Sequence, residues 1–205
     1  RKNGCAVAEP ERIKQVSGAL LAGGSLALFS EFSIGGVWPR GLHPAACAAK
    51  AQVVLSLSDT DPDGARPLHL VPRIAVLGVG CRRGTPAGQI LELLSDFLAR
   101  AQVSRRALCR VCSIDLKARE PGLLEACRTL GLPLSTYPAQ ALAALPGPFT
   151  PSAFVQSVTG VDNVCERSAV LAAGGPLVFH KYAHTGVTFA LAVRPFAPDW
   201  RWQNV

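Results

Sequence analysis

The sequence contains no methionine and few aromatic residues. Its 205 residues begin at Arg1, so we expect them to be a piece of a longer chain. Phe, Trp and Tyr together make up 6% of the residues, and Ala, Leu and Val must therefore form most of the core. Because 49% of the residues are apolar and 17% are charged, the composition excludes a disordered chain and predicts a globular one.

Long apolar runs and common catalytic signatures are also missing. No stretch reaches the roughly 18 apolar residues needed to span a bilayer, so we expect no membrane partner. The chain has no P-loop, no HExxH and no GxSxG sequence. The familiar patterns of phosphate-binding loops, zinc proteases and serine hydrolases therefore find no match here.

The seven cysteines are an odd number and lie mostly within apolar runs. This usage is typical of reduced, buried thiols and predicts a cytoplasmic protein without a disulfide framework. Cys109 and Cys112 have CxxC spacing, but no second pair matches them. Residues three apart on a strand also point to opposite faces, so we expect no metal site at these two cysteines.

The formal net charge of +7 favours an anionic partner. The basic residues are dispersed along the chain rather than gathered in one block. Few aromatic residues lie among them on which bases could stack, and we therefore expect no nucleic acid as partner. A polycarboxylate ligand suits the positive charge and needs neither a block of basic residues nor aromatic residues for stacking.

The apolar pattern divides the chain into two α/β regions, residues 1–72 and 73–205. For the first region it predicts a helix over 9–22 and strands over 25–29, 52–57 and 68–71. It also predicts a loop over 33–44. In the second region, strands alternate with helices and a hairpin comes last. The predicted fold class is α/β: a three-layer sandwich with a mostly parallel, mixed sheet and an antiparallel edge hairpin, preceded by a smaller α/β region.

The main polar feature is the turn GVGCRRGTP, residues 78–86, between a buried strand and a helix. Gly80 allows close backbone approach to a ligand, and the following helix N-terminus favours an anion. Arg82 and Arg83 can bind carboxylates bidentately, and Thr85 can cap the helix or donate a hydrogen bond. A dinucleotide site, a solvated structural turn and a carboxylate site are the three interpretations. The spacing is GxGxxxG, without an acid about 20 residues later, so we favour the carboxylate site.

A second polar cluster, Asp115, Lys117 and Glu120, follows the predicted strand 108–114 and opens a helix. The carboxyl ends of parallel strands meet at one edge of a sheet, so we expect this loop to face the same rim as the arginine turn. The three side chains could supply acid, base and cation there. Alternatively, Glu120 supports the helix start and Asp115 pairs with Lys117.

A third cluster lies in TGVDNVCERSA, residues 159–169, where another helix begins. Thr159 belongs to a turn, and Asp162 or Asn163 is the expected N-cap of the helix. Glu166 then falls in the first helical turn, where a carboxylate suits the helix dipole. A purely structural role for Glu166 is therefore as plausible as a ligand contact.

The last predicted hairpin carries Lys181 between two other polar residues. Regular alternation along a strand places His180 and Tyr182 together, on the face opposite Lys181. One face must belong to the core, so either Lys181 or the other pair looks outward. A lone Lys or His on a strand is more often a surface or a satisfied core residue than a catalytic one.

Five blocks of sequence follow one another between Pro72 and Val193. They are GVGCRRGT (78–85), SIDLKAREPGLLEAC (113–127), LGLPLSTYPA (130–139), TGVDNVCERSA (159–169) and KYAHTGVTFALA (181–192). In order and spacing they resemble the C-terminal domain of the cobalamin-biosynthesis family CbiG, to which the CobE proteins are also similar. Residues 1–71 are similar to the more variable central region of CbiG.

The resemblance implies cobalt-precorrin 5A hydrolase activity. This reaction opens the ring-A δ-lactone of a cobalt-corrin intermediate and releases acetaldehyde, giving cobalt-precorrin 5B. The expected partner is thus a polyanionic macrocycle, which suits a net basic protein. Because the substrate carries the cobalt, we expect no cofactor and no protein-bound metal. A homodimer and contacts with other cobalamin-pathway enzymes are further expectations.

Lactone opening needs an activated water molecule and a donor for the developing oxyanion. The expected catalytic residues are Asp115, Lys117 and Glu120. Either carboxylate could orient water, while Lys117 or the backbone N–H groups of residues 80–85 could hold the oxyanion. The expected substrate-binding residues are Gly80, Arg82, Arg83, Thr85, Thr159, Glu166 and Lys181.

One feature usual in the resembled family is missing. CbiG proteins usually carry a further N-terminal domain with a Gly-His-x-Gly-Gly-Ala-Asn-type motif, which this sequence lacks. CobE-like proteins, by contrast, consist of the C-terminal domain alone. Two hypotheses therefore stay open, a hydrolase or part of one, and a non-catalytic tetrapyrrole-binding module. A dinucleotide-binding protein is a remote third.

Overall fold

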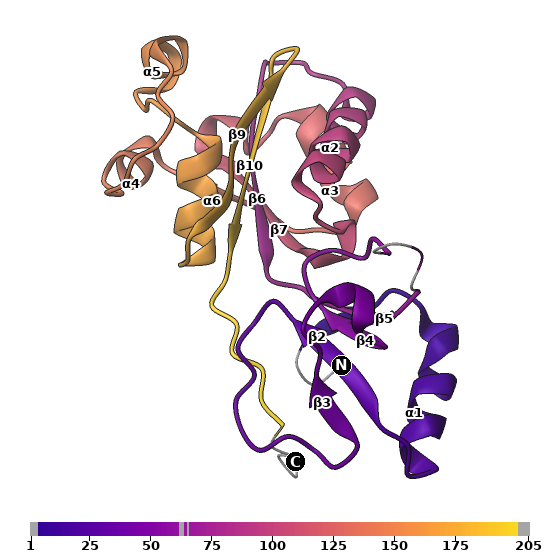
Figure 1. Ribbon diagram of the computed structural model, residues 1–205. Helices are drawn as coiled ribbons and strands as arrows, with labels where there is room; N and C mark the ends of the chain where they lie inside the picture. Colours follow the sequence, from indigo (N-terminus) through magenta and orange to yellow (C-terminus); the bar gives the residue numbers. More distant parts are fainter. Residues whose placement is uncertain (1–3, 62–63, 65, 201–205) are drawn as a thin grey trace. The chain divides into compact units, whose positions relative to one another are not determined.

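The computed structural model describes residues 4–61, 64 and 66–200, and they form two compact units (Figure 1). The first unit holds the residues up to Arg73, the segment Gln102–Ala107 and the described residues from Phe196 onward. The second holds Ile74–Ala101 and Leu108–Pro195. The segment Gln102–Ala107 returns to the first unit, and no apolar pattern in the sequence predicts this return. A polar contact helps to hold the segment there, since Ser104 donates its N–H to the Leu57 carbonyl oxygen at 2.8 Å.

The first unit contains a five-stranded sheet in the order β1-β5-β4-β2-β3. The strands are β1 (Cys5–Val7), β2 (Leu26–Ser30), β3 (Leu42–Pro44), β4 (Val53–Leu55) and β5 (Leu68–Pro72). Helix α1 (Ile13–Leu21) follows a short 3₁₀-helix, and buried Leu28, Val53 and Leu68 form a core cluster of the unit. The predicted loop over 33–44 is wrong at its end, where β3 pairs with β2 as an edge strand, a position that tolerates its proline.

The second unit contains a sheet in the order β8-β7-β6-β10-β9. Its strands are β6 (Ala75–Cys81), β7 (Leu108–Ile114), β8 (Leu134–Tyr137), β9 (Leu177–His184) and β10 (Val187–Val193). Strands β6, β7 and β8 are parallel, whereas β10 runs antiparallel to both β6 and β9. The predicted mixed sheet with an antiparallel hairpin at one edge is confirmed.

Helices cover both faces of this second sheet. Figure 1 shows α6 (Cys165–Ala173) on one face, and α2 (Ala87–Ala101) with α3 (Pro121–Leu130) on the other. Two short helices, α4 (Ala139–Ala143) and α5 (Ala153–Thr159), lie between β8 and α6 in the chain. The predicted three-layer α/β fold is confirmed. In the described part of the chain, no helix has both the length and the apolar character needed to cross a membrane.

Strand β9 is not regular, and the predicted alternation of its side chains is wrong. Phe179 pairs with Leu191 and Tyr182 pairs with Phe189, so His180 and Lys181 together oppose one residue of β10. Such a β-bulge shifts the phase of the strand. Tyr182 consequently stacks on Phe97 of α2, while His180 reaches Glu166 of α6, on the opposite face.

Gly78 sets the distance between α6 and the sheet. A β-carbon at Gly78 would lie 1.8 Å from the carbonyl oxygen of Cys165, a backbone atom that cannot move alone. We expect Gly78→Ala to lower the free energy of unfolding by at least about 1–3 kcal/mol through overpacking, as measured by denaturant unfolding. Gly88→Ala, in α2 with nothing within 4 Å, is the control and should be neutral or slightly stabilising.

Candidate functional site

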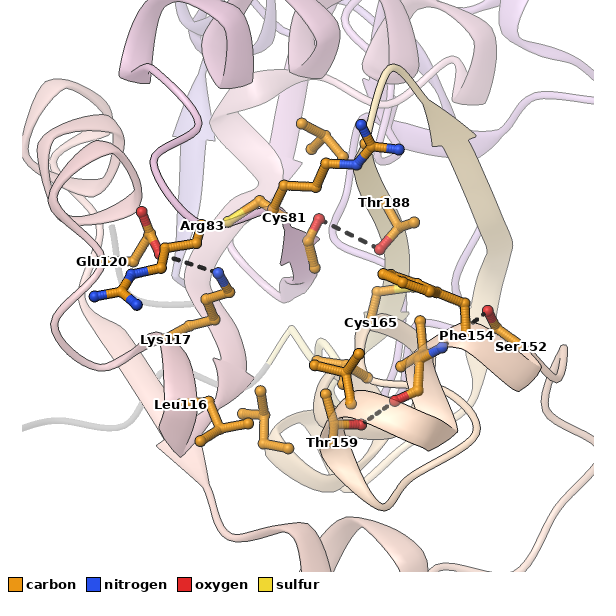
Figure 2. A pocket seen from close by; sticks show the side chains of 18 of the residues that line it. Cys81, Arg83, Leu116, Lys117, Glu120, Ser152, Phe154, Thr159, Cys165 and Thr188 are labelled. Atoms are coloured by element: carbon orange, nitrogen blue, oxygen red, sulfur yellow. Dashed lines mark hydrogen bonds and ion pairs between the residues drawn. The ribbon is translucent and has the colours of Figure 1, made fainter.

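A cavity of about 1100 Å³ lies in the second unit, at one edge of its sheet (Figure 2). The parallel strands β6 and β7 end there, at Cys81 and Ile114. Val187 pairs with Cys81, which brings the turn between β9 and β10 to the same edge. Helix α5 and the start of α6 complete the lining. Ligands of open α/β sheets bind in this position, beyond the carboxyl ends of the strands.

Buried Glu120 joins the two loops that follow β6 and β7. Its Oε1 accepts the N–H of Gly84 at 2.7 Å, and its Oε2 accepts a hydrogen bond from Lys117 Nζ at 3.0 Å. The prediction that the loops face one rim is confirmed. The alternative pairing of Asp115 with Lys117 is wrong, because Lys117 instead turns toward the buried carboxylate, while Asp115 is exposed.

The electrostatics of Glu120 keep it ionised at neutral pH. Burial raises the pKa of its carboxyl, but the hydrogen bonds from Lys117 and Gly84 and the positive charges of Lys117 and Arg83 lower it by more. The pKa of Glu120 therefore lies below its usual value. A carboxylate with a lowered pKa and both oxygens engaged is a weak general base.

The arginine turn after β6 is fixed by its own backbone. Gly84 has a φ of +75°, which glycine adopts at little cost. The hydroxyl of Thr85 donates to the carbonyl oxygen of Arg82 at 2.8 Å, so it stabilises the turn from inside. Gly122, in the first turn of α3, also belongs to this arrangement. A β-carbon there would lie 1.9 Å from the carbonyl oxygen of Thr85, so only glycine lets α3 approach this closely.

Glu166 is fully buried and organises the other side of the site. Its Oε1 accepts the N–H of Lys181 at 2.7 Å and the hydroxyl of Thr150 at 2.9 Å. Its Oε2 accepts the Thr150 N–H at 2.7 Å and the Asn163 amide at 2.9 Å, and His180 Nδ1 lies 3.3 Å from Oε1. This carboxylate thus ties the segment before α5 to the bulge of β9.

The start of α6 places Glu166 in this position. The Asn163 side-chain oxygen accepts the N–H of Glu166 at 2.8 Å, but the N-cap residue of α6 is Val164, so the predicted N-cap is wrong by one position. Asp162 instead pairs with Arg167, at 2.7 Å between Oδ1 and Nε. Burial raises the pKa of Glu166, but its hydrogen bonds from Thr150, Lys181 and His180 lower it by more, so the net shift is downward.

The charge of the cavity lining is strongly positive. Among the described residues that line it, one side chain is acidic, Glu120, and five are cationic. The cationic residues are Arg82, Arg83, Lys117, Arg119 and Lys181. Figure 2 shows Arg83, Lys117 and Glu120 across the cavity from Phe154 and Thr159. The site therefore joins a cationic side to an apolar one.

Two cysteines line the cavity without the properties of nucleophiles. Burial raises the pKa of the Cys165 thiol to about 11 and also raises the pKa of Cys81. Both thiols are therefore protonated at neutral pH, and the thiolate is the reactive form. In the described part of the chain, no group of three or more His, Cys, Asp and Glu side chains is arranged to hold a metal ion.

Most of the residues predicted for the site lie together. Those that line the cavity are Gly80, Arg82, Arg83, Lys117, Glu120, Thr159 and Lys181. Asp115, Thr85 and Glu166 are outside the lining: Asp115 is exposed, and Thr85 and Glu166 are buried with their oxygens engaged within the protein. The roles of all ten in binding or catalysis stay predictions.

Four residues of the lining were not predicted from the sequence: Arg119 and the apolar residues Leu116, Phe154 and Val158. Arg119 lies between two residues that were singled out, so its sequence position was a usable signal. The apolar residues gave no usable signal in the sequence, because an apolar residue on a short helix is ordinarily assigned to the core.

The second unit contains most of the residues by which the chain matches a known protein family. The family described as "Cobalamin synthesis G C-terminus" matches residues 75–192, which include both loops, Glu166 and the hairpin. The chain belongs to this CbiG C-terminal family. Its place is therefore in cobalamin biosynthesis, as the sequence resemblance predicted.

Two curated relatives extend the match. The chain is 34% identical over 144 residues to the cobalt-precorrin-5A hydrolase of Salmonella typhimurium, covering 70% of this chain and 41% of that protein. It is 37% identical over 120 residues to protein CobE of a Sinorhizobium species, covering 57% of this chain and 78% of that protein. The chain thus spans less than half of the hydrolase but most of CobE.

Solved structures agree with the fold. The crystal structure of CobE, a protein of the cobalamin (vitamin B12) biosynthetic pathway, matches with a TM-score of 0.57 and 31% identity, covering 62% of this chain and 94% of CobE. A cobalamin biosynthesis protein G homolog from Sulfolobus solfataricus matches with a TM-score of 0.51 and 19% identity, covering 94% of this chain and 58% of that one. The second likeness shows the fold alone.

The lowered pKa of Glu166 links the stability of the protein to pH. A carboxylate whose folded-state pKa is depressed stabilises the protein above its unfolded pKa, and this contribution is lost as the pH falls through the folded value. We expect Glu166→Gln to lower the melting temperature at pH 7 and to flatten its decline below about pH 4.5. Thermal unfolding followed at several pH values checks this. Glu125→Gln removes one partner of an exposed ion pair with Arg128 and should leave the dependence of the melting temperature on pH unchanged.

Proposed function

We propose that the second unit binds a cobalt-corrin intermediate of cobalamin biosynthesis, as part of a protein of the cobalt-precorrin-5A hydrolase type. The observation that carries the proposal is the cationic cavity at the carboxyl ends of β6 and β7. A corrin precursor bears many acetate and propionate groups around an apolar macrocycle. Five cationic side chains and the exposed apolar side chains of Leu116, Phe154 and Val158 in one lining match that chemistry.

The size of the cavity supports a large ligand. Small-molecule sites commonly measure roughly 300–1,000 Å³, and this cavity, at about 1100 Å³, lies just above that range. Arg82 and Arg83 are exposed at its rim, so their guanidinium groups can meet carboxylates without first leaving a buried position. The cobalt would arrive within the macrocycle, and the proposal assigns it no protein ligand.

Hydrolysis in this cavity is a second candidate function. The relative from Salmonella typhimurium is named for that activity, and Lys117 could stabilise an oxyanion at the rim. The N–H groups of Arg82, Gly84 and Thr85 already donate to acceptors within the protein. Activation of water is harder to assign, since both oxygens of Glu120 already accept hydrogen bonds and Asp115 is outside the lining. Release of acetaldehyde from cobalt-precorrin 5A by this chain would favour the second candidate over binding alone.

The arginine turn provides the most direct test of binding. We expect Arg82→Ala and Arg83→Ala each to weaken the affinity for a corrin polycarboxylic acid about tenfold or more, because each removes charge-assisted hydrogen bonds. Isothermal titration with the free acid measures the loss. The fully esterified corrin, which has the ring but no carboxylates, should bind weakly to the unchanged protein.

Arg128→Ala is the matched control, because Arg128 lies in an exposed ion pair on α3 and is not among the cavity residues. Its corrin affinity should equal that of the unchanged protein. Equal affinities for the acid and its ester, or full affinity after both cavity substitutions, would contradict the proposed function.

A further inference from the structure

Three large apolar side chains beside the cavity are exposed to solvent. Leu116, Phe154 and Val158 have relative exposures of 65%, 70% and 61%, and all three line the cavity. Leu116 follows β7, whereas Phe154 and Val158 lie four residues apart on α5 and therefore share one face of that helix. We call these three residues the apolar wall. Figure 2 shows Leu116 on the side of Lys117 and Phe154 across the cavity, so these exposed apolar groups border the cavity from two sides. Exposed apolar groups around one cavity indicate a binding surface.

The three residues of the wall are mostly exposed to solvent, so packing within the second unit does not explain their apolar character. Helix α5 contacts a core cluster through the partly buried Val155, whereas Phe154 and Val158 are left exposed. The helix is nevertheless held in place. Ser152 caps it by accepting the N–H of Val155, and buried Glu166 fixes the preceding segment through both the N–H and the hydroxyl of Thr150. The wall is thus an anchored surface rather than a fraying end.

The cations of the same cavity restrict what can cover the wall. Arg83 and Lys117 lie across the cavity from Phe154 (Figure 2). An occupant that satisfies both sides must carry anionic groups at its margin and a broad apolar surface in between. A flexible polycarboxylate satisfies the cations alone, and an apolar peptide satisfies the wall alone.

We propose that the apolar wall docks the face of a corrin-type macrocycle and so selects ring-shaped polycarboxylates over acyclic ones. This inference rests on the proposed function, because it assumes that the cations hold the carboxylates of the same ligand. In this arrangement the aromatic ring of Phe154 stacks on the macrocycle, and Leu116 and Val158 cover its remaining apolar area. The arginines supply affinity for any polycarboxylate, and the wall supplies selectivity for the ring.

The test compares two ligands on four proteins: the unchanged chain, two cavity variants and one control variant. The ligands are a corrin polycarboxylic acid and an acyclic tetracarboxylate, butane-1,2,3,4-tetracarboxylate, each measured by isothermal titration. We expect Phe154→Ala to weaken corrin binding about tenfold while leaving acyclic binding unchanged, because it removes stacking and buried area but no charge. Arg82→Ala should weaken both ligands.

Leu21→Ala is the matched control, because Leu21 is an exposed apolar residue of α1, in the first unit. It should change neither affinity. Because Phe154 is exposed, its removal should leave the melting temperature nearly unchanged, and a large drop would contradict the description of the wall as a free surface.

Two results would overturn the inference in different ways. If the unchanged protein binds the corrin and Phe154→Ala binds it equally well, the wall has another role and the proposed function survives. If the unchanged protein binds neither polycarboxylate, the proposed function fails and the inference fails with it. Sedimentation of both proteins identifies the main rival, since a dimer lost in Phe154→Ala with corrin affinity intact would assign the wall to a second copy of the chain.

Discussion

One buried carboxylate holds the candidate site together. Glu120 accepts the Gly84 N–H from the loop after β6 and the Lys117 ammonium from the loop after β7, so two loops that are distant in sequence keep one geometry. A buried ion pair of this kind adds little net stability, because desolvation offsets the attraction. The ion pair instead positions side chains, since it places Arg82, Arg83 and Lys117 at one rim of the cavity.

Glu166 has the corresponding effect on the other side of the cavity. It is also a buried carboxylate saturated by hydrogen bonds, and it fixes both Lys181 and the segment that leads to α5. Neither acid is available to activate water, and both thiols of the lining are protonated at neutral pH. The cavity therefore presents fixed cations together with exposed apolar side chains, and its acids and thiols are already engaged or protonated.

The sequence was sufficient to predict much of this arrangement. The alternation of strands and helices predicts the three-layer sheet, and the rule for parallel strands predicts that the two loops meet. Contacts that depend on tertiary packing could not be predicted from the sequence. The bulge of β9 reverses the expected face of Tyr182, and the pairing of Lys117 with Glu120 rather than Asp115 requires knowledge of which carboxylate is buried. The exposed face of α5 is equally hidden, because apolar spacing alone does not distinguish core from binding surface.

We propose that a corrin polycarboxylate occupies the cavity of the second unit, between the arginine turn and the apolar wall. Hydrogen exchange of the backbone amides, measured by mass spectrometry with and without such a ligand, tests it most directly. Bound ligand should slow the exchange at residues 80–84, 116–120 and 153–159. Unchanged exchange at these segments, with protection confined to the first unit, would contradict it.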